Sequence, residues 1–400
     1  MHQEQRDRDS DDALGWLSAV LWPDGGTEIR AGGSGSRTWW ASPSATTPHI
    51  LIPANAPAAA RRAVRRYHDG FDRSRRAKSL LAEATMSIPG LSAQLLRGSR
   101  VGQGPDATDG VLDGLAELLD QPDLVVAISL SVPKSNRKPV LQLLTPSGHC
   151  LGWAKVGWSP ISERLVANEA TWLDRRAANP IPLGRDGSEL VIPQLLNDEV
   201  VAGRRVVITS GVEVARRPGD RPDALPPLDV FGAVAARGTV DTVALAESTW
   251  WQSVQDALSG ADAAERVAVE AAADAAAGHR FDVGAWHGDL TPWNLMTVGR
   301  RIQLIDWELA ADGVPIGFDL CHFHTQVGAE MKGLSGADAL NRSARLSPQG
   351  LTGLGIDARN HTILWRLYLV ELVRRMLVLR ADGYPTEQLD HGPAALARLS

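Results

Sequence analysis

The segment WHGDLTPWNLM, residues 286–296, places Asp289 and Asn294 five residues apart, directly behind apolar residues. Asp306 follows twelve residues further on, at the end of the apolar run RIQLI, which predicts a short strand between the two positions. Three oxygen-bearing side chains would then gather in one cluster of loops. Mg²⁺ prefers few carboxylates together with phosphate oxygens, so Asn294 and Asp306 are suited to hold a nucleotide-bound cation. Asp289 then remains to orient an attacking hydroxyl group and accept its proton.

Each of these residues also has an ordinary explanation when it is taken alone. The tripeptide His-Gly-Asp is common, and an aspartate that follows a strand often caps a helix or lies in a turn. The complete set, in this order and at these spacings, is a far more specific signal than any one member. We therefore interpret residues 286–310 as a site for phosphoryl transfer.

The set resembles the signature of the aminoglycoside phosphotransferase and choline kinase family, small-molecule kinases with a protein-kinase-like fold. The family pattern His-Gly-Asp-x4-Asn followed by Asp-Trp is matched by His287, Gly288, Asp289, Asn294, Asp306 and Trp307. Protein kinases keep the Asp-to-Asn spacing, but they have Arg before the first Asp and Phe-Gly after the second. Gly288 and Trp307 therefore favour a small molecule as phosphate acceptor. The resemblance also implies that His287 helps to fix the loop and that Asp319, in GVPIGFDL, braces it.

The fold that the resemblance implies requires a strand lysine that contacts the nucleotide phosphates and a helix glutamate that holds this lysine. Only five of the 41 basic side chains are lysine, so each lysine is an uncommon choice in this chain. Lys155 lies in the apolar stretch LGWAKVGW, and Glu169 follows fourteen residues later in a helix predicted over 161–178. The alternative is a solvent-facing strand lysine with a solvated helix glutamate.

Other nucleotide contacts are expected from two turns. The turn SVPKSNRKP, residues 131–139, lacks the glycine that lets backbone amides approach phosphates. It carries Ser135 and Asn136, which look like the Ser-Asn of related kinases, and we assign both to nucleotide binding; an ordinary hairpin turn is the alternative. The nucleobase is expected against the backbone from Thr209 to Gly211.

The predicted elements fit an α+β, bilobal protein-kinase-like fold with an extra N-terminal module. A nucleotide-binding N-lobe over 121–212 would be a five-stranded antiparallel sheet, with strands over 123–132, 138–146, 149–158, 189–196 and 204–212. A mostly helical catalytic C-lobe over 213–400 would include helices over 241–258, 261–278 and 361–383.

The N-terminal module, residues 1–120, contains no motif that indicates a role. Residues 1–12 are too charged to pack and are expected to be disordered. Strands are predicted over 14–22 and 49–54, and a helix is predicted over 56–84 with a break near Gly70.

Composition excludes several classes of protein. A 44% hydrophobic content over 400 residues can build a sizeable globular core, and a net charge of -6 with scattered basic residues argues against nucleic acid or anionic membrane as a partner. Cys150 and Cys321 are too few for a disulfide framework or a four-thiolate zinc site. The polar start and the absence of a long apolar run predict a cytoplasmic protein.

Some conspicuous residues are assigned less weight. His322 and His324 could ligate a metal, but without a third ligand at suitable spacing a packing or polar-network role is favoured. The two TWW stretches, 38–40 and 249–251, could stack on a sugar ring, although a core role is favoured. Glu308, next to Trp307, is a candidate for the acceptor side of the site.

The expected function is a kinase that uses Mg²⁺ with ATP or GTP and phosphorylates a hydroxyl group of a small molecule. Residues 229–280 scatter their acids, whereas a polycationic acceptor needs clustered carboxylates, so a neutral sugar or polyol is the expected acceptor. One alternative is a catalytically silent nucleotide-binding pseudokinase with a regulatory or scaffolding role, which the glycine-free turn favours. Another is a kinase acting on protein side chains, which Gly288 and Trp307 disfavour. The sequence does not indicate the oligomeric state.

Overall fold

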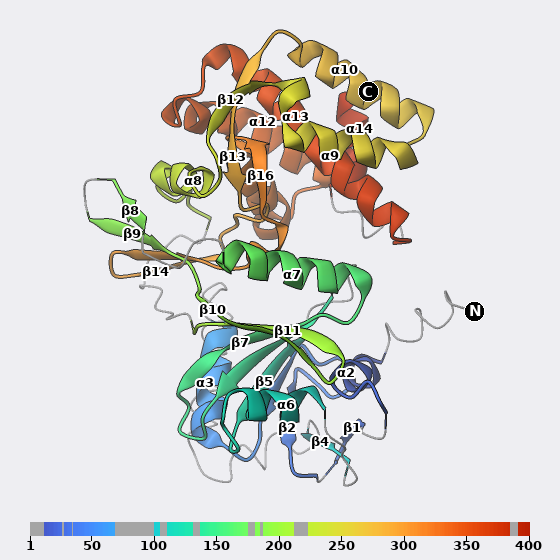
Figure 1. Cartoon of the computed structure of the whole chain (residues 1–400), viewed down its shortest axis with the longest axis vertical. Helices are drawn as coiled ribbons and strands as arrows, with labels where there is room; N and C mark the ends of the chain where they lie inside the picture. The colour runs from blue at the N-terminus through green and yellow to red at the C-terminus, as the bar shows by residue number, and fades with distance from the viewer. Residues whose placement is uncertain are drawn as a thin grey trace. The chain divides into compact units, whose positions relative to one another are not determined.

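The computed structural model of the chain describes residues 12–25, 28–33, 35–68, 100–104, 110–130, 137–174, 181–184, 187–211, 223–384 and 391–400 (Figure 1). The chain forms two compact units. Unit 1 comprises Met1–Asp174 and Pro193–Arg216, and unit 2 comprises Arg175–Ile192 and Arg217–Ser400. Within the described ranges, no helix has both the length and the apolar character that crossing a membrane requires.

Unit 1 is built on one nine-stranded sheet with the strand order β1-β4-β2-β3-β5-β6-β7-β11-β10, in which all neighbouring strands are antiparallel. Its strands are β1 (Ile29–Ala31), β2 (Thr38–Ser42), β3 (Ile50–Pro53), β4 (Arg100–Gln103), β5 (Val125–Leu130), β6 (Pro139–Leu144), β7 (Cys150–Val156), β10 (Leu195–Val201) and β11 (Arg204–Thr209). Its helices are α2 (Ala13–Leu21), α3 (Pro57–His68), α6 (Val111–Leu118) and α7 (Pro160–Asp174).

Alternation along the strands assigns the helices of unit 1 to two faces of the sheet. Val206 and Ile208 of β11 belong to a large apolar core that also contains residues of α2 and α6. Val207, between them, packs instead against Val166 and Ala170 of α7. Helix α3 packs against Ala127 of β5 and Leu144 of β6. Their neighbours along the strands, Val126 and Leu143, belong to the large core. Successive strand residues point to opposite faces, so α2 and α6 cover one face and α3 and α7 cover the other.

The mixed class with an antiparallel N-terminal sheet is confirmed, but the number of strands differs from five. The meander of β5, β6 and β7 is present, and β11 joins β7 as the sheet continues. Four further strands come from the N-terminal region, because β3 pairs with β5 and carries β2, β4 and β1 beyond it. The described part of the N-terminal module therefore shares the sheet of the predicted N-lobe.

The strand predicted over 14–22 is wrong, because these residues form helix α2. The run LGWLSAVLW is apolar at almost every position, so its periodicity does not distinguish a strand from a buried helix. The deciding residue precedes the run: the carboxylate of Asp12 accepts hydrogen bonds from the backbone N–H groups of Leu14 and Gly15 and caps the helix. Leu14, Leu17 and Leu21 are buried at helical spacing.

Unit 2 contains two small sheets, β12-β13-β16 and β14-β15-β9-β8, and most of the helices that lie in the described ranges. Its strands are β8 (Ile181–Leu183), β9 (Ser188–Val191), β12 (Asp241–Ala244), β13 (Arg280–Trp286), β14 (Leu295–Val298), β15 (Arg301–Leu304) and β16 (Ala311–Pro315). Its α-helices are α8 (Leu228–Ala235), α9 (Thr249–Ala257), α10 (Ala263–Ala276), α11 (Phe318–Gln326), α12 (Gly336–Gly353), α13 (Ala358–Ala381) and α14 (Gly392–Leu399). Short helical turns are η2 (Leu245–Glu247), η3 (Leu258–Gly260), η4 (Trp307–Leu309) and the π-helical η5 (Val327–Met331).

Two predicted elements are divided in the structure. The run predicted as one strand over 189–196 forms the end of β9 in unit 2 and the start of β10 in unit 1, with Pro193 between them. A proline has no N–H group to donate to a sheet, so a break at this residue is expected. The helix predicted over 241–258 begins only at Thr249, where Ser248 caps it, and the residues before it form β12 and η2.

Candidate active site

The loop of residues 287–294 begins directly after β13 and depends on a glycine. Gly288 has a φ of +80°, in the left-handed region that side chains disfavour. A Cβ atom at this position would collide with the carbonyl oxygen of Leu309. Both the backbone conformation and the available space therefore require glycine at position 288.

Asp319, in the first turn of α11, holds the start of the 287–294 loop. Its Oδ2 accepts a hydrogen bond from the backbone N–H of His287 at 2.8 Å, and its Oδ1 accepts one from that of Gly288 at 3.1 Å. Burial raises the pKa of the Asp319 carboxyl group to about 7, although both backbone bonds act to lower it. The bracing contact that the family resemblance implies for Asp319 is present.

A second brace comes from α13, and sequence reasoning missed it. Nη2 of Arg375 donates a hydrogen bond to the backbone carbonyl of Gly288 at 2.8 Å. Glu371, whose side chain is fully buried, accepts hydrogen bonds from both Arg374 and Arg375. Burial acts to raise the pKa of Glu371, but the two guanidinium groups bring it to about 2. The spacing of ELVRR on one helix was the available signal, because residues three and four apart lie on one helix face.

His287 connects the loop to the segment that carries Asp306. Its Nδ1 accepts a hydrogen bond from the backbone N–H of Asp289 at 3.2 Å, so the ring proton lies on Nε2, which donates to the carbonyl of Ile305 at 3.0 Å. The imidazole ring of His287 is fully buried. It packs edge-on against the indole ring of Trp307, with 4.8 Å between the two ring centroids. Because both ring nitrogens bond to backbone, the arrangement suits a positioning role.

Asp289 is held by two side chains. Its Oδ2 accepts a hydrogen bond from Nδ2 of Asn294 at 2.9 Å, and its Oδ1 lies 3.3 Å from Nε2 of His322. Nδ2 of Asn294 also donates to the backbone carbonyl of Asp289 at 2.9 Å. The Asp289 side chain keeps 26% of its surface exposed, whereas that of His322 keeps 1%. The carboxylate is thus fixed and still accessible, as a general base must be.

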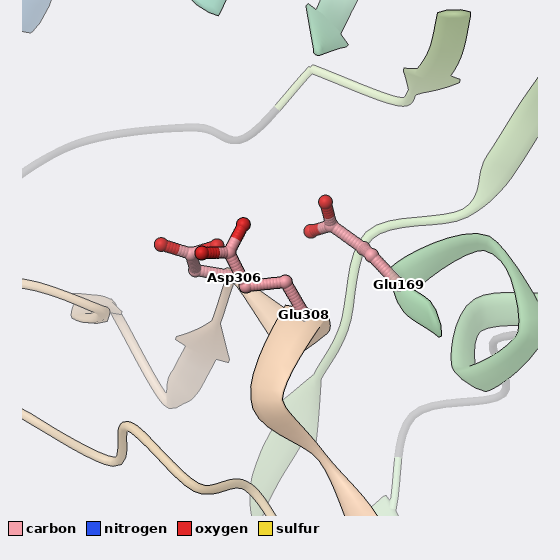
Figure 2. Close-up of side chains that lie close together, drawn as sticks. All are labelled: Glu169, Asp306 and Glu308. Carbon is pink, nitrogen blue, oxygen red and sulfur yellow. The ribbon is translucent and has the colours of Figure 1, made fainter. Parts of the chain in front are cut away.

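Asn294 and Asp306 are brought together by a hairpin. Strands β14 and β15 are antiparallel, and the N–H of Ile305 bonds to the carbonyl of Asn294 at 3.0 Å, which extends the ladder to the residue before Asp306. The side-chain nitrogen of Asn294 points to Asp289, so Oδ1 of the same amide group faces away from Asp289. Carboxylate oxygens of Asp306 and Glu308 lie within 4.8 Å of each other, and Figure 2 shows the two groups side by side.

Asp306 itself has an unusual backbone. Its φ of 72° and ψ of 59° are left-handed, and it stands at the N-terminus of η4 without a capping bond from its side chain. Aspartate and asparagine tolerate this region better than other residues that carry a side chain. The Asp306 carboxylate therefore does not cap the helical turn that follows and lies beside that of Glu308.

The register of unit 1 explains how Lys155 meets Glu169. Lys155 of β7 lies opposite Val207 of β11, on the face that α7 covers, and Glu169 precedes Ala170 in the part of α7 that contacts this face. Nζ of Lys155 lies 2.6 Å from Oε2 of Glu169, with side-chain exposures of 14% and 3%. Figure 2 shows Glu169 projecting from α7. The pairing is present, and the role of both residues in nucleotide binding stays a prediction.

The other predicted nucleotide contacts are placed only in part. Thr209 is the last residue of β11 and is buried, and Gly211 follows it outside the strand. Ser135 and Asn136 lie outside the described residues.

The two histidines of α11 have separate surroundings. His322 contacts Asp289, whereas His324 packs against Phe323, and burial together with Arg342 lowers the pKa of His324 to about 4. In the described part of the chain, neither belongs to a group of three potential metal ligands. His322 thus takes part in a polar network with Asp289 and Tyr368, and His324 packs in a buried environment.

The tryptophans of both TWW stretches are core residues. Trp39, Trp40, Trp250 and Trp251 are all buried. Trp39 donates its indole N–H to the carbonyl of Val126. A stacking role on a sugar ring is therefore not supported.

Comparison with known proteins finds no matching family model and no matching curated protein. One similar solved structure is a thermostable mutant of the aminoglycoside phosphotransferase APH(4)-Ia in ternary complex with ADP and hygromycin B. The two chains are 17% identical, the alignment covers 71% of this chain and 95% of that chain, and the TM-score is 0.43. A candidate fructosamine-3-kinase from Haemophilus somnus has 10% identity, the same coverage and a TM-score of 0.43. A choline/ethanolamine kinase family protein from Mesorhizobium loti has 16% identity, 68% and 86% coverage, and a TM-score of 0.38. At these low scores, function has to be argued from the residues of the chain itself.

Proposed function

We propose that the protein is a small-molecule kinase that transfers the terminal phosphate of ATP or GTP to a hydroxyl group. The observation that carries the proposal is the position of Asp289. Its carboxylate is anchored and accessible, and it lies beside the hairpin that brings Asn294 to Asp306. Phosphoryl transfer needs such an arrangement, because the protein contributes mainly position and charge.

In the proposed reaction Asp289 orients the acceptor hydroxyl group and takes its proton. The hydroxyl oxygen then forms a bond to the terminal phosphorus, and the bond from this phosphorus to the bridging oxygen of the nucleoside diphosphate breaks. Two hydrogen bonds from Asn294 limit the movement of the Asp289 side chain and backbone. The geometry supports general-base catalysis by a carboxylate that is already oriented.

The donor set fits a magnesium ion that accompanies the nucleotide. Asp306 offers a carboxylate, Asn294 offers Oδ1, and Glu308 offers a second carboxylate near that of Asp306. Hard oxygen ligands in small number, with the remaining positions left for phosphate and water, are what Mg²⁺ prefers. When bound, the cation would neutralise charge on the phosphates.

The nucleotide contacts proposed for unit 1 rest on the Lys155 and Glu169 pair. A buried glutamate that holds a strand lysine fixes the ammonium group in one position. We propose that this ammonium group contacts the phosphates and that the backbone from Thr209 to Gly211 contacts the purine. Ser135 and Asn136 are proposed to contact the phosphates as well.

A neutral sugar or polyol is the proposed acceptor. A polycationic acceptor would require several carboxylates available to it. Asp319, Glu371 and Glu265 of unit 2 instead accept hydrogen bonds from backbone N–H groups or arginines. These acids are engaged in holding the fold, which supports an acceptor that is recognised by neutral hydrogen bonds.

The decisive experiment replaces Asp289 by asparagine, which keeps the shape and removes the charge and basicity. ADP or GDP release is measured with ATP or GTP against pooled sugars, polyols, amino alcohols and aminoglycosides, and nucleotide affinity is measured on the same protein. Asp289→Asn should lower turnover on the order of 10²-fold or more while nucleotide binding survives. Asp274→Asn, on the exposed side of α10, is the matched control and should behave like the wild type.

Two outcomes would contradict the proposal. Equal turnover by Asp289→Asn and the wild type would remove Asp289 from the reaction. Tight nucleotide binding by the wild type without turnover on any acceptor would favour the pseudokinase alternative.

A further inference from the structure

His322 lies one helical turn after Asp319 on α11 and meets the 287–294 loop from the same helix. Its Nε2 is 3.3 Å from Oδ1 of Asp289, and its Nδ1 is 3.2 Å from the hydroxyl oxygen of Tyr368 on α13. Tyr368 is fully buried and His322 is almost so. Three side chains from three elements therefore form a continuous line that ends on the proposed base.

The direction of the hydrogen bonds follows from the carboxylate. An ionised carboxylate only accepts hydrogen bonds, so Nε2 of His322 must carry the proton that faces Asp289. In the neutral imidazole, Nδ1 is then an acceptor for the hydroxyl group of Tyr368. The hydrogen bond from Tyr368 thus selects the ring tautomer and ring orientation that Asp289 requires.

We propose that His322 is a positioning residue for Asp289, held in turn by Tyr368; this inference rests on the proposed kinase function. Asn294 anchors Oδ2 and His322 anchors Oδ1, so rotation of the carboxylate about its terminal torsion is blocked from both sides. An ionised carboxylate has about four acceptor positions, so the two anchoring bonds are compatible with a hydrogen bond from a substrate hydroxyl group.

A residue that acts only through the base has a specific kinetic signature. Loss of His322 should lower kcat, because the base is no longer held in the productive orientation. The KM for the nucleotide should change little, because the proposed phosphate and cation contacts come from other residues. A general loss of folding would instead lower the active fraction and leave the kcat of the remaining folded enzyme unchanged.

The test is a matched pair of amide substitutions at one position. In His322→Gln the side-chain nitrogen can reach the place of Nε2, whereas in His322→Asn the chain is one methylene shorter and the nitrogen falls short of Asp289. We expect His322→Asn to lower kcat roughly 10- to 100-fold and His322→Gln to lose less than about 5-fold, both with nucleotide KM within about 2-fold. Thermal unfolding of both proteins establishes that they are folded.

Two further variants separate positioning from packing. Tyr368→Phe removes one hydroxyl group and should lower kcat about 3-fold, the effect of one lost hydrogen bond. In an Asp289→Asn background, His322→Asn should cause no further loss, because the group it positions no longer acts as a base.

The outcomes distinguish this inference from the proposed function. A wild-type enzyme that turns over, with Asp289→Asn impaired and both His322 variants equally active or equally inactive, overturns the positioning role alone. Additive losses in the double variant overturn it as well. A wild type without turnover on any acceptor overturns the proposed function and this inference together. If His322→Asn does not fold, equal kcat for Tyr368→Phe and the wild type decides against the inference.

Discussion

Two carboxylates brace the same turn of the 287–294 loop by opposite electrostatic means. Asp319 of α11 accepts the N–H groups of His287 and Gly288, and burial raises its pKa to about 7. Glu371 of α13 holds Arg375, which donates to the carbonyl of Gly288, and burial is outweighed there by two guanidinium groups that bring the pKa to about 2. The backbone N–H groups of the turn are held directly by the Asp319 carboxylate. The backbone carbonyl of Gly288 is held by Arg375, which the Glu371 carboxylate positions.

The difference shows that burial alone does not determine the state of an acid. Both carboxylates are removed from water, which disfavours the charged form of each. At Asp319 the two backbone N–H groups and the more distant charge of Arg375 offset only part of this penalty. At Glu371 the directly bonded guanidinium groups of Arg374 and Arg375 overcome it. The two braces should therefore respond differently to loss of charge and to pH.

The largest effect is expected from Glu371→Gln. The substitution leaves Arg374 and Arg375 next to a neutral amide in a buried site, and breaking a buried ion pair in this way costs about 3–5 kcal/mol. Urea unfolding followed by circular dichroism measures the loss. Asp357→Asn is the control, because it breaks an exposed pair with Arg359 at the start of the same helix and keeps a capping side chain. A loss no greater than that of the control would mean that the charge of Glu371 is not needed to hold the arginines.

An intermediate effect is expected from Asp319→Asn. One of the two carboxylate oxygens becomes an NH₂ group that faces a backbone donor, so one hydrogen bond is lost and one N–H is left unsatisfied, which costs about 1–3 kcal/mol. The same unfolding measurement applies. Asp282→Asn on β13 keeps an acceptor for Thr242 and should change stability by less than about 0.5 kcal/mol. If the Asp319 variant matched wild-type stability, the two backbone bonds would contribute little.

The smallest effect is a pH dependence of stability near neutrality that Asp319 should produce and Glu371 should not. The folded pKa of Asp319, about 7, lies above the unfolded value of about 4, so its contribution to stability rises as pH falls from 8 to 6, by about 1 kcal/mol. The lowered pKa of His324 acts in the opposite direction in both proteins, so the Asp319 contribution is the difference between them. Both pKa values of Glu371, about 2 folded and about 4 unfolded, lie below this window, and its contribution is lost only as pH falls from about 4 to 2. Unfolding at pH 8 and pH 6 is compared between the wild type and Asp319→Asn. An identical pH dependence in both proteins would contradict the raised pKa.

The candidate site shows which contacts a sequence reveals. Asp289, Asn294 and Asp306 lie in one short segment, and their spacing predicted a short strand and a common cluster of loops. The structure has two strands there, β14 and β15, which pair as a hairpin. Arg375 reaches Gly288 from a helix far along the chain, and Tyr368 of the same helix is linked to Asp289 through His322. Nothing in the spacing of the sequence connects these residues. Contacts of this kind depend on how helices pack, which a single sequence does not specify.

The fold was predictable to a similar degree. Apolar runs separated by turn residues predicted the strands around Lys155. The pairing of Lys155 with Glu169 was implied by the family resemblance, and the ion pair is present. Helix α2 was missed because a run that is apolar throughout lacks the hydrophobic periodicity that distinguishes a helix from a strand. The division at Pro193 was missed because the assignment of two adjacent strands to different sheets is a tertiary property.

The left-handed backbone of Asp306 has a consequence for how the chain can change by mutation. Glycine and asparagine also accept this conformation, and each differs from aspartate by a single nucleotide in the genetic code. Either replacement would keep the turn and remove the carboxylate. A single nucleotide change at this codon would therefore remove the charged ligand proposed for the cation and leave a folded chain, and selection on folding alone would not eliminate that chain.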